Sequence, residues 1–207
     1  MEIVCRVADP RARVLVIPSW WGLTRSFRDY AERLADAGFA VGLSDLFDGR
    51  TARTEDEARR LRAMPRKLPM YRTLIADIHA LMAAGPAPAT QVSLVGFSMG
   101  GHWAVWLSRQ PELPVRSTVL YYAARGGDFS QCRASILAHF AQDDPWVSAS
   151  ARQGMERALA RAQCRYRAHD YPGTGHWFAE ADRPEAYDKA AADLALERTI
   201  AHMRQPP

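Results

Sequence analysis

An apolar run that ends in Gly-x-Ser-x-Gly-Gly and then changes to a helical pattern is the feature that most constrains this chain. The run begins at Val92, and its turn contains Gly96, Ser98 and Gly100. A strand that turns sharply into a helix needs glycines where a Cβ would collide across the turn. Such a turn exposes Ser98 at the positive end of the helix, where the Met99 backbone N–H can meet a developing oxyanion. The pattern therefore predicts a nucleophile elbow.

Length and composition indicate one globular domain that spans residues 1–207. The chain is 48% hydrophobic and 24% charged, and 207 residues are enough to bury a single core. No apolar run approaches the roughly 20 residues that a membrane helix needs. The first residues contain Glu2 and Arg6, which is unlike a signal peptide. We therefore expect a cytoplasmic protein with no membrane partner.

The formal net charge of +4 raises the question of nucleic-acid binding. The basic residues are mostly arginines scattered among acids, as between Arg53 and Arg66, which is typical of a solvated helix face. No basic stripe interleaved with aromatic residues occurs, so we expect no nucleic-acid partner. The three cysteines, Cys5, Cys132 and Cys164, are far apart and lack metal-type spacing. They predict neither a disulfide framework nor a metal site.

Apolar strand patterns alternate with helical patterns along the chain. We expect strands at residues 2–7, 13–18, 39–43, 91–97, 117–123, 135–141 and 165–171, and helices at 24–37, 51–64, 70–84, from about 100, 149–162 and 184–203. This alternation predicts a mostly parallel sheet of about seven strands with helices on both faces, the α/β-hydrolase fold. The connection from 122 to 135 is too short for a lid domain, so we expect an open site.

The second expected helix carries clear signals at its two ends. Thr54 is a candidate N-cap, and Glu57 three residues later completes a capping box. Pro65 and Pro69 follow the charged run and are expected to break the helix.

A serine nucleophile needs a general base, and His176 is the best candidate among six histidines. His176 alone lies in a loop directly after the final expected strand, at the carboxyl edge where such sheets place their ligands. Its position after the serine also agrees with the order serine, acid, histidine of α/β-hydrolases. The other five lie within expected helices or strands, where packing or surface roles are the simpler interpretation.

Two adjacent aspartates compete for the role of the acid that orients the histidine. Asp143 and Asp144 both follow the strand at 135–141, again at the carboxyl edge. Asp144 precedes Pro145, whose fixed φ favours a reproducible loop, whereas Asp143 suits a turn or cap. We favour Asp144 and keep Asp143 as the alternative.

The chain resembles the dienelactone hydrolase family over nearly its whole length, particularly the compact members with a serine nucleophile. The matching stretches are residues 14–23, 45–51, 96–101, 138–145 and 171–178. The resemblance implies a triad of Ser98, Asp144 and His176, with the backbone N–H groups of Trp20 and Met99 as the oxyanion hole. It also implies hydrolysis of a small ester or lactone without a metal or organic cofactor.

Three positions depart from the family pattern. Well-known members use a cysteine nucleophile and a glutamate where this chain has Ser98 and Ser19, and an arginine for the substrate carboxylate where this chain has Glu180. We expect Glu180 to lie near the pocket and to disfavour carboxylated substrates, unless Arg125 or another basic side chain binds them.

Tryptophans cluster around the predicted site. Trp20, Trp21, Trp146 and Trp177 lie in loops that face it and are expected to line an acyl pocket, whereas Trp103 and Trp106 lie on the elbow helix and are expected to pack. Such a wall favours small, flat, uncharged esters or lactones.

Other functions share parts of this pattern. A non-catalytic receptor with the same fold is the main alternative, because fold alone does not prove activity. A thioesterase or a peptidase would use the same triad. Nothing in the sequence predicts the oligomeric state.

Overall fold

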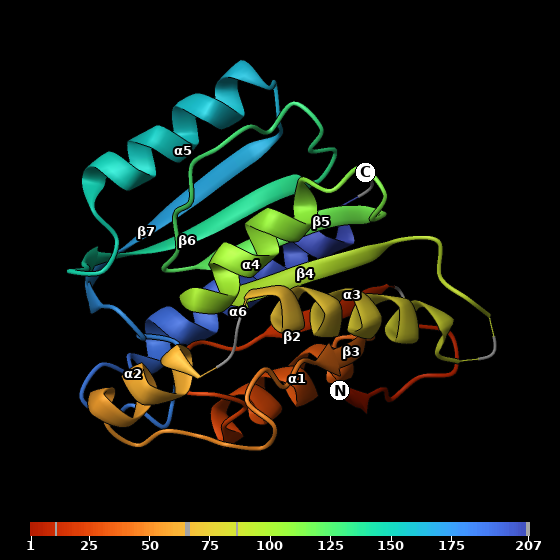
Figure 1. Ribbon diagram of the computed structural model, residues 1–207, viewed down its shortest axis with the longest axis horizontal. Coiled ribbons are helices and arrows are strands. Elements are labelled where there is room, and N and C mark those ends of the chain that lie inside the picture. The colour runs from red at the N-terminus through yellow and green to blue at the C-terminus, as the bar shows by residue number, and fades with distance from the viewer. Residues whose placement is uncertain (11, 65–66, 86, 206–207) are drawn as a thin grey trace.

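A computed structural model describes residues 1–10, 12–64, 67–85 and 87–205 of the chain (Figure 1). Its strands form one sheet in the order β1-β3-β2-β4-β5-β6-β7, in which β1 runs antiparallel to β3 and the other pairs are parallel. The strands are β1 (Glu2–Val4), β2 (Arg13–Ile17), β3 (Ala40–Leu43), β4 (Val92–Phe97), β5 (Val115–Tyr121), β6 (Ser135–Asp143) and β7 (Tyr166–Gly175). The predicted mostly parallel sheet of seven strands is confirmed.

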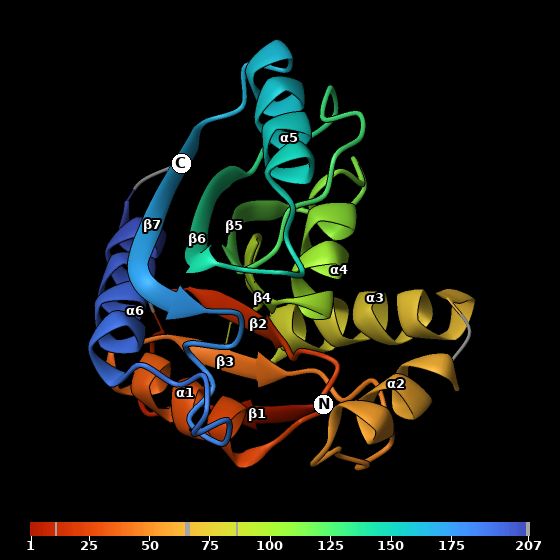
Figure 2. The ribbon, with the colours of Figure 1, turned by 90° about the vertical axis from the view of Figure 1, so that its left-hand side faces the viewer.

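Helices cover both faces of this sheet, as predicted. They are α1 (Arg25–Asp36), α2 (Glu55–Ala63), α3 (Lys67–Ala83), α4 (Met99–Ser108), α5 (Ala149–Arg161) and α6 (Lys189–Arg204). Figure 2 shows α1 and α6 on one face of the sheet and α3, α4 and α5 on the other. No lid domain is evident in the described part of the chain, and the stretch between β5 and β6 holds neither a helix nor a strand.

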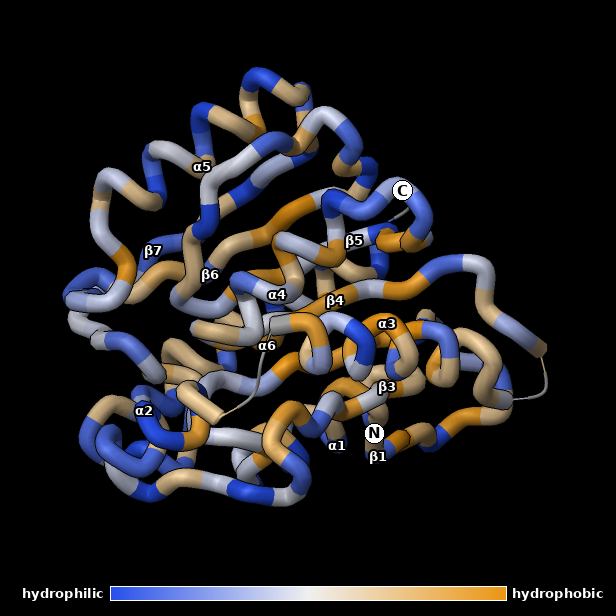
Figure 3. The backbone as a smooth tube through the Cα atoms, viewed as in Figure 1, coloured by the Kyte–Doolittle hydropathy of each residue, from blue (hydrophilic) through white to orange (hydrophobic). Residues whose placement is uncertain are grey.

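The central strands are buried on both faces because their residues are apolar on both faces. Every residue of β2 and β4 is buried, and Figure 3 shows β4 as a hydrophobic stretch at the centre of the molecule. Parallel strands under two helical layers carry such continuous apolar runs rather than an alternating pattern. The core therefore lies along the sheet, and β4 delivers the elbow serine to its carboxyl edge.

The ends of α2 and α3 show how local sequence sets the boundaries. The predicted capping box is present: Glu57 donates its backbone N–H to the Thr54 hydroxyl at 3.3 Å, and its carboxylate accepts the Thr54 N–H at 3.3 Å. The helix ends at Ala63, close to the predicted end, but Pro69 does not act as the predicted helix breaker. It lies in the first turn of α3, where its missing N–H leaves no intrahelical bond unmade. Pro65 lies outside the described residues.

The last helix begins later than predicted. Residues 180–187 form turns, and α6 begins after Asp188, whose carboxylate accepts the Ala191 N–H at 2.9 Å. This cap satisfies a helix N–H that would otherwise lack a partner. The predicted start at Pro184 is therefore wrong by about one helical turn.

The last strand is longer than predicted, and this lengthening positions the site. β7 continues to Gly175, four residues beyond the predicted end at Tyr171. Its pairing with β6 shifts after Ala141 so that Gly175 lies opposite Asp143. The residues that directly follow β6 and β7 therefore lie close together at the carboxyl edge of the sheet.

Within the residues that the structure describes, no helix combines the length and the apolar character needed to cross a membrane.

Candidate active site

Ser98 lies at a strained turn between β4 and α4. Its φ of 51° is in the left-handed region, which non-glycine residues adopt rarely and which costs energy unless the surroundings enforce it. A Cβ at Gly100 would collide with the backbone oxygens of Ile17 and Pro18, and one at Gly96 would collide with the backbone of Gly100. The predicted need for both glycines is confirmed.

Ser98, His176 and Asp144 form one chain of hydrogen bonds. The Ser98 hydroxyl lies 2.8 Å from His176 Nε2, and His176 Nδ1 lies 2.8 Å and 2.7 Å from the two Asp144 carboxylate oxygens. Because a carboxylate only accepts, Nδ1 carries the proton, and Nε2 is left free to accept the serine proton. The side chains of His176 and Asp144 are 4% and 5% exposed, so little water competes for these bonds.

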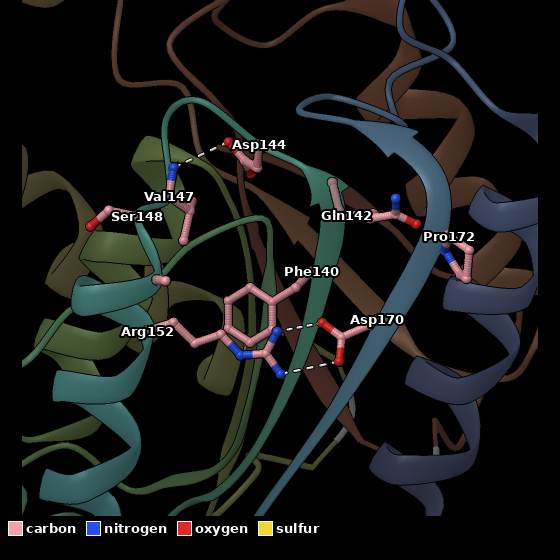
Figure 4. Close-up of a pocket in the computed structure, with 10 residues that line it drawn as sticks. Phe140, Gln142, Asp144, Val147, Ser148, Arg152, Asp170 and Pro172 are labelled. Carbon is pink, nitrogen blue, oxygen red and sulfur yellow. Dashed lines mark hydrogen bonds and ion pairs between the residues drawn. The ribbon is translucent and has the colours of Figure 1, made fainter.

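The loop after β6 selects Asp144 rather than Asp143. Asp144 Oδ1 also accepts the backbone N–H of Trp146 at 2.8 Å and that of Val147 at 3.1 Å. Figure 4 shows the bond to Val147. These donors fix the orientation of the carboxylate. Asp143 is the last residue of β6 and is exposed, so the alternative that the sequence left open has no geometric support.

The two predicted oxyanion donors lie at neighbouring ends of β2 and β4. Trp20 is in the turn after β2, and Met99 is the first residue of α4, whose N–H has no intrahelical acceptor. The close approach of Gly100 to Ile17 and Pro18 brings the two segments together. In the described part of the chain, neither N–H donates to another group. Both are available to a substrate oxygen.

A cavity of about 210 Å³ opens directly onto Ser98 and His176. It is lined by Trp20, Arg62, Ser98, Met99, His102, Tyr122, Trp146, Val147, His176 and Trp177. The rings of Trp20 and Trp146 pack edge to face at 5.0 Å, and Trp177 lies parallel to Trp20 at 6.1 Å. Three of the four predicted tryptophans therefore form an aromatic wall, and 45% of Trp146 is exposed at the mouth of the cavity.

Trp21 supports this wall from behind and does not line the cavity, contrary to the prediction. It is 2% exposed, and its ring meets Trp20 at 5.6 Å and Trp177 at 5.2 Å. The Arg183 guanidinium covers the same ring at 4.3 Å. Adjacent side chains in a short loop point in opposite directions, so only one of the two tryptophans faces the cavity. The sequence does not indicate which one.

Glu180 is likewise not a charge that faces substrate, so that expectation is wrong. The residue is fully buried, accepts hydrogen bonds from Ser19 and Tyr122, and does not line the cavity. Burial raises its pKa to about 8 despite these two bonds. At neutral pH the carboxyl group is therefore mostly uncharged, and it does not repel a substrate carboxylate.

The basic group in the cavity is Arg62, which sequence reasoning missed. Arg62 lies in the last turn of α2 and lines the cavity, whereas Arg125 does not. Among the described residues, no carboxylate forms an ion pair with Arg62. The charged run around it looked like a solvated helix face. Only the packing of α2 beside the carboxyl edge distinguishes Arg62 from its neighbours.

The described residues include no cluster of three or more histidine, cysteine, aspartate or glutamate side chains that could hold a metal ion. Cys5, Cys132 and Cys164 are free thiols.

Comparison with known proteins bears on the family and the fold. A protein of Bradyrhizobium sp named "Probable 2-oxo-3-(5-oxofuran-2-ylidene)propanoate lactonase" is 27% identical over 206 residues, which cover 92% of this chain and 82% of the relative. The structure of a dienelactone hydrolase-like promiscuous phosphotriesterase from metagenomic libraries superposes with a TM-score of 0.83 at 21% identity, covering 94% of this chain and 86% of that chain.

A structure from a study of the metagenome-derived lipolytic enzymes LipS and LipT has a TM-score of 0.72 at 17% identity, covering 98% and 97% of the two chains. At these identities the solved structures support the fold alone. The sequence profile of the dienelactone hydrolase family matches residues 3–206. The chain therefore belongs to the dienelactone hydrolase family.

Proposed function

We propose that this protein is a serine hydrolase that cleaves a small ester or lactone through an acyl-enzyme on Ser98. The observation that carries the proposal is the continuous chain from the Ser98 hydroxyl through His176 to Asp144, with separations of 2.7 to 2.8 Å. Membership of a hydrolase family and the name of a lactonase relative support the same reaction class.

The first half of the reaction forms the acyl-enzyme. Ser98 Oγ attacks the carbonyl carbon while its proton moves to His176 Nε2, and the Asp144 carboxylate stabilises the resulting imidazolium. The carbonyl oxygen becomes an oxyanion that accepts the Trp20 and Met99 N–H groups. When the tetrahedral intermediate collapses, the bond to the leaving oxygen breaks, and that oxygen takes the proton from Nε2.

The second half regenerates the serine. A water molecule gives a proton to His176 Nε2 as its oxygen attacks the acyl carbon. The bond to Ser98 Oγ then breaks, Oγ recovers the proton from Nε2, and the acid product leaves. With a lactone, the leaving oxygen remains part of the same molecule, so ring opening gives a single product.

The cavity limits the substrate in size and favours an anionic group. A volume of about 210 Å³ between aromatic walls suits a small, flat molecule. Arg62 supplies a guanidinium with no carboxylate partner in the described part of the chain, and guanidinium groups bind carboxylates well. The propanoate in the relative's name is consistent with such a substrate.

The direct test is p-nitrophenyl acetate turnover combined with stoichiometric labelling by a fluorophosphonate. We expect turnover and one adduct per chain at Ser98, and neither in Ser98→Ala. A folded wild-type protein with no turnover and no adduct would favour the non-catalytic receptor. Once activity is present, a panel of oxygen esters, thioesters and peptides separates the proposed esterase from a thioesterase or a peptidase by kcat/KM.

A further inference from the structure

A fully buried carboxyl group lies behind the proposed active site and has no part in the triad. Glu180 is 0% exposed. Its Oε2 accepts the Ser19 hydroxyl at 2.9 Å, and its Oε1 accepts the Tyr122 hydroxyl at 2.7 Å. A buried carboxyl is costly unless its oxygens are hydrogen-bonded, and here both are. The group therefore forms a defined junction between three segments.

Two of these three segments carry a group that the proposed reaction uses, and the third lines the cavity. Ser19 directly precedes Trp20, the proposed oxyanion donor, and its hydroxyl also lies 3.5 Å from the Trp21 backbone N–H. Tyr122 lines the cavity, and its ring lies 4.8 Å from that of His176. Glu180 itself follows His176 in a tight turn, closed by its own N–H to the Trp177 carbonyl at 2.9 Å.

Tyr122 needs such a restraint because its backbone is strained. Its φ of 39° is in the left-handed region, which a bulky residue avoids. The hydrogen bond from its backbone N–H to the His139 carbonyl at 2.7 Å holds one side of the residue, and Glu180 holds the hydroxyl. Strained residues persist only where several contacts fix them.

We propose that Glu180 is a positioning residue: its carboxyl group holds the Ser19–Trp20 turn and Tyr122 against the turn that carries His176. This inference rests on the proposed hydrolase function and deepens it. Errors of about 1 Å in the position of reacting groups can cost about 100-fold in rate, so a junction that fixes the oxyanion donor relative to the base affects kcat.

The charge state of the junction adds a readout that a merely structural role would not produce. The groups around the carboxyl are Tyr122 from the end of β5, Asp182 and Arg183 from its own turn, and the Ser19 hydroxyl after β2. Burial raises the pKa of Glu180 to about 8. Above this pH a negative charge appears next to the Ser19–Trp20 turn, where it disfavours an oxyanion. We therefore expect kcat to fall on the alkaline side.

The test compares two substitutions at one position in the full chain, with p-nitrophenyl acetate as the substrate. Glu180→Gln keeps the shape and offers one acceptor and one donor, as the neutral carboxyl group does, so that one of the two hydroxyls donates to it and the other accepts from it. Glu180→Met keeps the length and removes the bonds. We expect kcat to fall roughly 10- to 100-fold in Glu180→Met with KM changed less than about threefold. Glu180→Gln should stay close to wild type at pH 7 and lose the alkaline fall.

Asp77 offers a matched control, because it is a second buried carboxyl that accepts a serine hydroxyl. Ser44 donates to it at 2.7 Å, and the pair joins α3 to the residue after β3 without lining the cavity. Asp77→Asn should leave kcat and the pH profile unchanged. If Glu180→Met does not fold, Ser19→Ala removes one arm of the junction and should lower kcat with KM little changed.

The results separate this inference from the proposed function. If the wild-type protein hydrolyses the ester but Glu180→Met or Ser19→Ala keeps wild-type kcat, the positioning role is wrong and the hydrolase proposal stands. An alkaline fall that persists unchanged in Glu180→Gln would also overturn it. If the wild type neither turns over nor reacts with the fluorophosphonate, the hydrolase proposal itself has failed.

Discussion

Two histidines in this molecule are buried and hydrogen-bonded through both ring nitrogens, yet their surroundings favour opposite behaviour. His176 lies between Asp144 and Ser98 at the sheet edge. His139 lies within β6, where Nδ1 is 2.8 Å from the Tyr171 hydroxyl and Nε2 is 3.0 Å from the Thr199 hydroxyl. The number of hydrogen bonds therefore does not identify a catalytic base.

The difference lies in the charge of the partners and in access to a cavity. His176 has a carboxylate that stabilises an imidazolium and a serine that opens onto the 210 Å³ cavity. His139 is 0% exposed and has only neutral partners, and burial, with His169 and Arg198 nearby, holds its pKa well below the usual range. In the proposed mechanism His176 accepts a proton transiently, whereas His139 remains neutral.

Removing either end of the proton path should have the largest effect. We expect Ser98→Ala and His176→Ala each to lower kcat by about 10³-fold or more, with the double variant no worse than either single one, because nucleophile and base act as a unit. Steady-state assays with p-nitrophenyl acetate measure this. His139→Gln is the control and should retain kcat per folded molecule. Wild-type turnover in a folded Ser98→Ala protein would show that the nucleophile is misassigned.

Replacing the carboxylate partner tests which aspartate makes His176 differ from His139. Asp144→Asn should lower kcat by roughly 10² to 10⁴, because the histidine loses both its tautomer and the charge that stabilises its imidazolium. Asp143→Asn should have little effect, since that side chain is exposed at the end of β6. The two variants need only a kcat comparison at one pH. The reverse ranking would transfer the role to Asp143.

Arg62 tests what the open side of the His176 site binds. Arg62→Gln should lower kcat/KM for a carboxylated lactone by about threefold, and that for a neutral aryl ester less, because Arg62 is exposed at the cavity and an exposed guanidinium–carboxylate pair contributes roughly 0.2–1 kcal/mol. Arg60→Gln, on the same helix turn but outside the cavity, is the matched control. Equal losses for both substrates would argue against an anion site.

Replacing His139 should change the stability of the fold rather than the reaction rate. The folded-state pKa of His139 is lowered, so below about pH 6.5 the unfolded chain binds a proton that the folded chain does not, and stability falls with pH. Urea titrations at pH 7.5 and 5.5 should show that this loss is roughly 1 kcal/mol smaller in His139→Gln than in wild type. An equal loss in both proteins would mean that His139 is protonated when folded.

The sequence was most informative where one residue type is sterically or chemically required. Gly96 and Gly100 flank a turn that tolerates no Cβ, and the capping box of Thr54 and Glu57 is a local bond between residues close in the chain. The order of Ser98, Asp144 and His176 along the alternating strands was equally direct. These features depend on local geometry or on the order of strands and helices, and both can be predicted from one sequence.

Features that depend on which way a side chain turns were not predictable in this way. Trp21 and Glu180 follow predicted site residues closely in the chain, yet both turn into the interior, while Arg62 turns from a charged helix face into the cavity. Pro69 and the late start of α6 show the same limit for helix ends. In each case distant packing rather than local pattern decided the outcome.

The most direct test of the central claim is a pre-steady-state measurement with p-nitrophenyl acetate at enzyme concentrations comparable to the product formed. We expect a burst of p-nitrophenol that approaches one equivalent per chain when deacylation is slower than acylation. Rapid quenching and peptide mass analysis should then locate the acetyl group on Ser98. Turnover without any acetylated Ser98 peptide, undiminished in Ser98→Ala, would contradict an acyl-enzyme at this serine.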